Sequence, residues 1–255
     1  MKNMAILKIN NSDLDNARLS NILTPIDTKL KNFDFSNTVV NKPWGHEYLL
    51  YSNDNTAIWI MYIKKDFGNS MHCHIEKKTV LILLSGEAVF STLQGGHIIK
   101  ESDAVIIDKK TFHSTQAISN EGIFVMEIET PVNKVDLLRL FDTYGRETKG
   151  YESGNEISSN INHYNAVFLD KKELNVAKNV GNMCLCLKGF SEDTALIEYI
   201  RKGSQFASVV IEGAVSNDLS GELIMPGELI STEHYQEKKI RISKKPLVLL
   251  SISRN

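Results

Sequence analysis

Short apolar segments alternate with polar turn residues along most of the chain. From residue 57 these segments are rich in Val, Ile, Phe and Tyr, which favour strands, and Gly95-Gly96 marks a tight turn. The predicted strand segments of this half are 57–65, 79–93, 97–101, 103–108 and 122–130. Regularly spaced strands without long helices between them predict an antiparallel sandwich, jelly roll or barrel.

One short helix is predicted near the N-terminus. Ser12 suits an N-cap, Leu14, Ala17 and Ile22 are spaced like one helical face, and Pro25 ends the pattern. We therefore expect a helix within residues 12–24, in an N-terminal segment that precedes the first barrel.

The second half repeats the strand pattern after a polar stretch. Residues 147–162 contain several Gly and Ser residues and predict a linker. Further strands are predicted at 165–170, 183–190, 195–203, 206–215, 221–231 and 238–253. Because VVIEGAV resembles LILLSGEAV in the first half, we interpret the second half as a degenerate internal copy. The predicted parts are an N-terminal segment at 1–37, a barrel at 38–150 and a second, degenerate barrel at 151–255.

Composition narrows the function classes. The formal net charge of the 255 residues is −2, and Lys and Arg are scattered, so we expect neither nucleic acid nor a membrane as partner. No signal-peptide core or membrane-length apolar run is found, which predicts a cytoplasmic protein. Cys73, Cys184 and Cys186 form no CxxC pair and are interpreted as core thiols.

Three histidines carry the candidate chemistry. His72 and His74 are two residues apart in a predicted strand, so both imidazoles point to one face. His113 follows a hairpin that returns the chain beside that strand, which completes a three-imidazole site for one divalent ion. Zinc is the first expectation, with manganese, nickel, cobalt and iron as alternatives. Three histidines leave open positions for water or substrate.

These residues resemble the motifs of the cupin superfamily. Gly68, His72, His74 and Gly86 match its first motif, and Asp103 and His113 match its second. The position of the motif glutamate holds Thr79, with Glu76 nearby. The resemblance implies an all-β bicupin, with two jelly-roll barrels of which the second is degenerate.

Two flanking segments are similar to the cupin domain of type II mannose-6-phosphate isomerases. They are NKPWGHEYLL at 41–50 and VDLLRLFDTYGRE at 135–147. The resemblance implies isomerisation of an aldose or ketose phosphate, with a metal on the O1 and O2 oxygens. The implied bases are Glu47, Glu76 and Glu127. The implied substrate-binding residues are Arg139 and Arg146 for the phosphate, Lys42 and Trp44 at the rim, and Tyr144.

Other readings stay open. A non-catalytic cupin could bind a sugar phosphate or sugar nucleotide as a structural or regulatory protein. A non-haem iron dioxygenase would also use three histidines with open positions. Arg146 could simply pair with Asp142. A homodimer and a role in surface polysaccharide synthesis are further expectations.

Overall fold

A computed structural model describes residues 4–21, 33–146, 156–202, 205–217, 221–230 and 240–255. The chain divides into two compact units, Ile6–Ala166 and Val167–Asn255 together with Met1–Ala5. The boundary expected at residue 150 falls at 147–155, outside the described residues.

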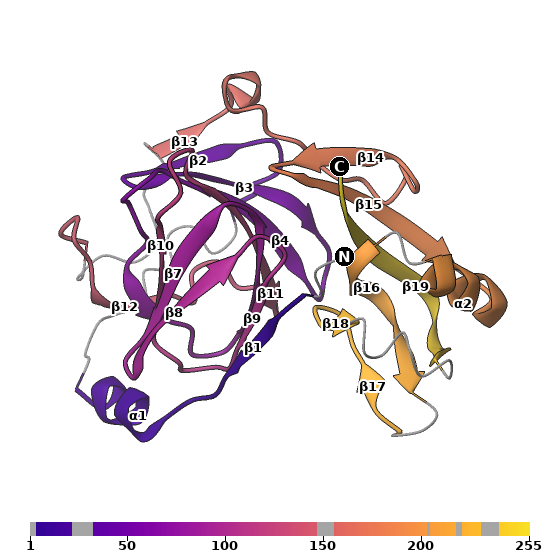
Figure 1. Cartoon of the computed structure of the whole chain (residues 1–255), viewed down its shortest axis with the longest axis horizontal. Helices are drawn as coiled ribbons and strands as arrows, with labels where there is room; N and C mark the ends of the chain where they lie inside the picture. The colour runs from indigo at the N-terminus through magenta and orange to yellow at the C-terminus, as the bar shows by residue number, and fades with distance from the viewer. Residues whose placement is uncertain (1–3, 22–32, 147–155, 203–204, 218–220, 231–239) are drawn as a thin grey trace. The chain divides into compact units, whose positions relative to one another are not determined.

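Two antiparallel sheets build the first unit (Figure 1). One has eight strands, in the order β1 (Ile6–Ile9), β9 (Ala104–Ile107), β6 (Lys78–Ser85), β11 (Ile123–Thr130), β4 (Ala57–Ile63), β3 (Gly45–Ser52), β2 (Val39–Lys42) and β13 (Ile157–Ser158), with β1 parallel to β9. The other has five, in the order β12 (Leu138–Phe141), β5 (Met71–Cys73), β10 (His113–Ala117), β7 (Glu87–Thr92) and β8 (Gly95–Lys100).

The two sheets face each other across a shared core. Met61, Leu83 and Val125 come from the eight-stranded sheet, and Ala88 and Phe90 come from the five-stranded sheet; all are buried in one apolar cluster. Alternation along each strand places these side chains on the inner faces. The first unit is therefore a jelly-roll barrel, as the strand pattern predicts.

The predicted N-terminal helix is confirmed as α1 (Asp13–Leu19). The Ser12 side chain accepts a hydrogen bond from the Asp15 backbone, and the Asp15 carboxylate accepts one from the Ser12 backbone N–H. This capping box satisfies two backbone donors at the start of the helix. The rest of the segment, residues 22–32, lies outside the described residues.

The second unit contains one antiparallel sheet. Its strands, in order, are β14 (Ala177–Val180), β15 (Met183–Phe190), β19 (Ile240–Arg254), β16 (Gln205–Asn217) and β17 (Leu223–Ile224), with β18 (Leu229–Ile230) also paired to β16. These strands match the segments predicted at 183–190, 206–215, 221–231 and 238–253. The all-β fold class is confirmed, and the second unit is the less complete of the two.

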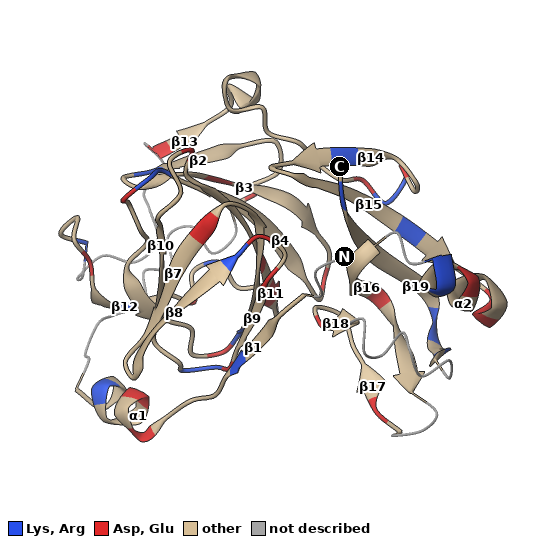
Figure 2. Cartoon of the chain, viewed as in Figure 1, with Lys and Arg blue, Asp and Glu red and all other residues tan. Residues whose placement is uncertain are grey.

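Two predicted strands of this half are wrong. Residues 195–202 of the segment predicted at 195–203 belong to helix α2 (Asp193–Lys202), in which Leu196 and Ile200 share one buried face four residues apart. Asp193 lies in its first turn and Arg201 in its last, where each charge interacts favourably with the helix dipole. Figure 2 shows acidic and basic positions on α2. The segment 165–170 forms no strand and follows the 3₁₀ helix η2 (Ile161–Tyr164).

Among the described residues, no helix combines the length and apolar character of a membrane span.

Candidate metal centre

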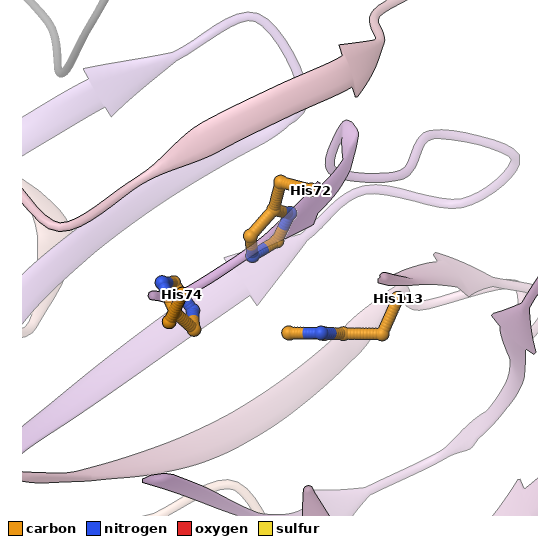
Figure 3. A group of neighbouring side chains, drawn as sticks. All are labelled: His72, His74 and His113. Atoms are coloured by element: carbon orange, nitrogen blue, oxygen red, sulfur yellow. The ribbon is translucent and has the colours of Figure 1, made fainter. Parts of the chain in front are cut away.

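The three predicted histidines lie side by side on the inner face of the five-stranded sheet. His113 at the start of β10 is directly opposite His72 in β5, and His74 follows β5 on the same face. Their rings face one another in Figure 3, with ring centroids 4.5–5.5 Å apart. One nitrogen from each ring lies within 4.8 Å of the other two. The predicted three-imidazole cluster is thus present, and all three side chains are buried.

Backbone carbonyl groups fix the orientation of each ring. The acceptors are Ser70 O (2.7 Å from His72 Nδ1), Asp136 O (2.6 Å from His74 Nδ1) and Thr111 O (2.9 Å from His113 Nδ1). A carbonyl oxygen cannot donate, so each Nδ1 carries the proton and each Nε2 presents a lone pair. Metal-binding histidines typically donate the hydrogen of their other ring nitrogen to an oxygen in this way.

The electrostatic environment keeps the rings neutral. Burial lowers the pKa of His72, His74 and His113, and the neighbouring imidazoles lower those of His72 and His74 further. Neutral imidazole is the form that binds a metal ion. Protonation therefore does not compete with metal binding at neutral pH.

The donor set fits a divalent transition-metal ion. His74 Nε2 is buried and has no hydrogen-bond partner among the described residues, as expected of an atom reserved for a cation. Cys73 lies between the two histidines in sequence, but its side chain packs with Phe112 and Leu138 in a separate apolar cluster. Burial raises the pKa of the Cys73 thiol to about 12, so it stays protonated.

Two acidic residues hold the segments that carry the histidines. The Asp136 carboxylate accepts hydrogen bonds from the backbone N–H groups of residues 75, 76 and 77, at 2.8, 2.8 and 3.0 Å. The Asp15 carboxylate of α1 accepts one from Phe112 N at 2.8 Å, next to His113. Neither residue was singled out from the sequence, because each acts on backbone far away along the chain.

His72 and His74 line a cavity inside the first unit, whereas His113 lies outside its lining. The volume of the cavity is about 50 Å³, and it is partly open to solvent. Its lining residues are Lys42, Trp44, Glu47, Met61, Asn69, Ser70, His72, His74, Lys77, Glu127, Glu129, Lys134, Leu137, Arg139 and Arg146. Five of these are cationic and three are carboxylates, so the lining has a positive balance before any metal binds.

A network of buried ion pairs crosses this cavity. Glu47 contacts Lys42 at 3.3 Å and Lys134 at 3.1 Å, and Glu129 contacts Lys134 at 3.8 Å and Lys77 at 2.6 Å. Burial opposes the charge of Lys134, but the carboxylates of Glu47 and Glu129 outweigh it and raise its pKa. Lys134 also lies 3.6 Å from the centre of the Trp59 ring. The cavity therefore holds fixed positive charge.

The three predicted bases are placed differently. Glu47 and Glu127 line the cavity, and Glu127 Oε1 lies 3.7 Å from His74 Nε2. Glu76 is exposed, accepts a hydrogen bond from Asn133 and is not part of the lining. Glu129, which the sequence analysis did not select, lies two residues from Glu127 on the same face of β11, and burial raises its pKa.

The two residues predicted at the rim lie at the turn between β2 and β3. Lys42 and Trp44 both line the cavity, and Trp44 is also buried in the core cluster. Gly45 has φ +154°, and a Cβ atom there would lie 2.0 Å from the Tyr62 carbonyl oxygen. Only glycine permits this close approach of the turn to β4.

The predicted phosphate-binding arginines also line the cavity. Arg139 pairs with His72 across β12 and β5 and is buried. Arg146 donates to both Asp142 oxygens, at 2.8 and 2.9 Å. This is the ion pair expected from the sequence as the alternative to phosphate binding by Arg146. Tyr144 lies outside the lining and donates its hydroxyl hydrogen to Gly68 O at 3.0 Å.

Lys77, Glu129 and Lys134 are the charged cavity residues that sequence reasoning missed. The period-two spacing of Glu127 and Glu129 within an apolar strand is the signal that places both on one face. Lys77 and Lys134 lie outside the named strands, where no periodicity predicts the direction of a side chain.

No family model and no curated protein matches the sequence. Among solved structures, KdgF from Halomonas sp. aligns with a TM-score of 0.35 and 12% identity over 36% of this chain and 84% of that one. A sugar phosphate isomerase of the cupin superfamily from Silicibacter pomeroyi aligns with a TM-score of 0.33 and 11% identity, over 44% of this chain and 68% of that one. The capsular polysaccharide assembling protein CapF from Staphylococcus aureus aligns with a TM-score of 0.35 and 15% identity, over 41% of this chain and 34% of that one. Similarities this distant do not indicate an activity.

Proposed function

We propose that the first unit is a metal-dependent enzyme that interconverts a small aldose phosphate and its ketose. The observation that carries this proposal is a cluster of three buried histidines, two of which, His72 and His74, line a cavity with more cationic than acidic side chains. A divalent ion held by His72, His74 and His113 would act as a Lewis acid on adjacent carbonyl and hydroxyl oxygens of the substrate.

The cationic side chains provide the binding site for the phosphate group. Arg139 is buried beside His72, and Lys77 and Lys134 line the same cavity. Arginine can donate two parallel hydrogen bonds to phosphate oxygens, while a lysine acts as a point charge. Arg146 is already bound to Asp142, so its role in the proposal is to close one side of the cavity.

A carboxylate in the cavity would move the proton between C1 and C2. Glu47 forms ion pairs with both Lys42 and Lys134. We assign this step to Glu129, because burial raises its pKa and the hydrogen bond from Lys77 stabilises its carboxylate.

The test begins with metal analysis of the purified full chain beside His72→Ala. Stoichiometric divalent metal in the wild type and its loss in the variant are expected. The metal-loaded protein is then assayed for interconversion of mannose 6-phosphate, glucose 6-phosphate and fructose 6-phosphate. Turnover that is abolished by His72→Ala and lowered by about 10²–10⁴-fold in Glu129→Gln supports the proposal. A metal-loaded protein that converts none of these sugars argues against it.

A second candidate is a cupin that binds a sugar phosphate or sugar nucleotide without converting it. The buried ion pairs favour this reading, because Glu47 and Glu129 are both in contact with lysines. Equilibrium dialysis with sugar phosphates would then show saturable binding that does not lead to product. Iron content and oxygen consumption would instead identify a dioxygenase.

A further inference from the structure

Glu127 occupies a position that the ion-pair network does not explain. It lies on the inner face of β11, only 6% exposed, between Trp59 of β4 and Leu81 of β6 in the strand ladder. Glu47 and Glu129 contact lysines, whereas the described ion pair of Glu127 is with His74 Nε2, at 3.7 Å. The carboxylate therefore lies beside the His74 edge of the histidine cluster.

These two atoms are both electron-rich. His74 Nδ1 donates its hydrogen to Asp136 O, so Nε2 presents a lone pair to the carboxylate. Two buried acceptors that face each other are unfavourable without a proton or a cation between them. A distance of 3.7 Å is too long for a hydrogen bond. It is close to the separation of two ligand atoms that are each about 2.0–2.2 Å from one ion.

We infer that Glu127 is the fourth protein ligand of the metal ion, with His72, His74 and His113. The inference rests on the metal site of the proposed function and assigns Glu127 to the metal rather than to proton transfer. The sequence position that matches the cupin motif glutamate, Thr79, is buried but does not line the cavity. A carboxylate from β11 thus takes the place that this motif position leaves empty.

Four protein ligands restrict the choice of metal. A tetrahedral zinc ion would be saturated by three imidazoles and one carboxylate and would keep no position for substrate. A six-coordinate ion such as manganese, cobalt or nickel would keep two open coordination positions, enough for two adjacent substrate oxygens. The site therefore selects a six-coordinate ion over zinc for catalysis.

The experiment measures binding of Co²⁺ alone to the chelator-treated full chain, by competition with a coloured chelator and by visible absorption. The variants are Glu127→Gln, the matched control Glu129→Gln two residues along the same face, and His72→Ala. Far-ultraviolet circular dichroism confirms folding. If Glu127→Gln does not fold, Glu127→Asp is measured instead, because its shorter side chain moves the carboxylate oxygens away from the ion and keeps their charge. The same weakening of Co²⁺ binding is expected.

We expect Glu127→Gln to weaken Co²⁺ binding more than about 100-fold and to change the visible bands, because a ligand is lost. Glu129→Gln should stay within about tenfold of wild type with unchanged bands, since it alters only the surroundings of the ion. Equal weakening in both variants with unchanged bands would show a purely electrostatic effect and overturn the ligand assignment. Wild-type affinity in Glu127→Gln, together with loss of binding in His72→Ala, would overturn it while leaving the metal site intact. If the wild type binds no Co²⁺, the metal site itself fails.

Discussion

Asp136 holds His74 and the backbone that follows it. Its carboxylate accepts three consecutive backbone N–H groups after His74, and its carbonyl oxygen accepts the hydrogen of His74 Nδ1. One residue thus fixes both the backbone after β5 and the tautomer of a ligand. Such positioning residues affect metal binding without touching the ion.

Asp136→Ala is expected to weaken metal affinity by about 10–100-fold and to lower the free energy of unfolding of the metal-free protein by about 1–3 kcal/mol. The loss follows because three backbone N–H groups lose their acceptor. Asp136→Asn keeps one acceptor oxygen, so its metal affinity and free energy of unfolding should lie between those of the wild type and Asp136→Ala. Urea unfolding and metal titration measure both effects, and an unchanged midpoint for Asp136→Ala would contradict the assignment.

His46 predicts a pH dependence of stability that is separate from the metal site. Its ring lies 4.8 Å from that of Tyr164 and 5.4 Å from that of Tyr62, and its Nε2 is buried. Burial lowers the pKa of His46 to about 4, whereas the unfolded chain has a value near 6.5. Between these values the unfolded state binds more protons, so stability is present above pH 6.5 and is lost as the pH falls toward 4.

His46→Phe should therefore lose less stability than the wild type between pH 7 and pH 5, by about 1 kcal/mol after allowance for solvent screening. Urea unfolding at both pH values, with chelator present so that both proteins are metal-free, measures the difference. Equal losses in the two proteins would show that His46 is not an acid-sensitive group.

Helix α1 connects the N-terminal segment to the metal site. Asp15 belongs to its capping box and also accepts the hydrogen of Phe112 N, while Asn11 donates to Lys110 O at 2.8 Å. Both contacts fix the turn that precedes His113. An element that forms by local capping thus determines where a distant ligand lies.

Asp15→Ala is expected to lower the free energy of unfolding by about 1–3 kcal/mol and to weaken metal binding, because the cap and the Phe112 contact are lost together. Asp13→Ala is the matched control, since Asp13 is an exposed acid in the same first turn and should change stability by less than about 0.5 kcal/mol. Thermal unfolding and metal titration of both variants test this. If both substitutions lowered stability equally, the loss would come from the change in helix charge alone and not from the contacts of Asp15.

Local patterns predict elements better than they predict the site. The spacing of His72 and His74 places both on one face, and the strands of the first unit follow from period-two alternation. The segment 195–203 was misread because Ile197, Tyr199 and Ile200 favour strands, although Leu196 and Ile200 have helical spacing. Lys77, Lys134 and Asp136 could not be predicted, since long-range contacts of the loops determine their positions.

Each unit of the whole molecule has an apolar core of its own. One cluster contains residues such as Phe90 and Val125, and a separate one contains residues such as Leu196 and Leu249. The metal-binding histidines all belong to the first unit. A ligand stabilises only the cooperative unit that binds it.

Metal binding is therefore expected to slow amide hydrogen exchange at 71–74, 113–117 and 138–139 and to leave the exchange of 183–190 and 247–252 unchanged. At a free metal concentration of 100 times Kd the first unit should gain about 2.7 kcal/mol of stability. Hydrogen exchange followed by mass spectrometry, with and without metal, makes the comparison. Equal slowing in both units would show that they unfold together.

Arg139, His72 and His113 form one row across β12, β5 and β10. A shift of one residue in a strand turns every side chain to the opposite face. Insertion or deletion of a single residue within these strands would therefore abolish the site even though every functional residue type remained in the sequence. In a library of variants, the other positions of these strands should tolerate many exchanges of residue type but almost no change of length.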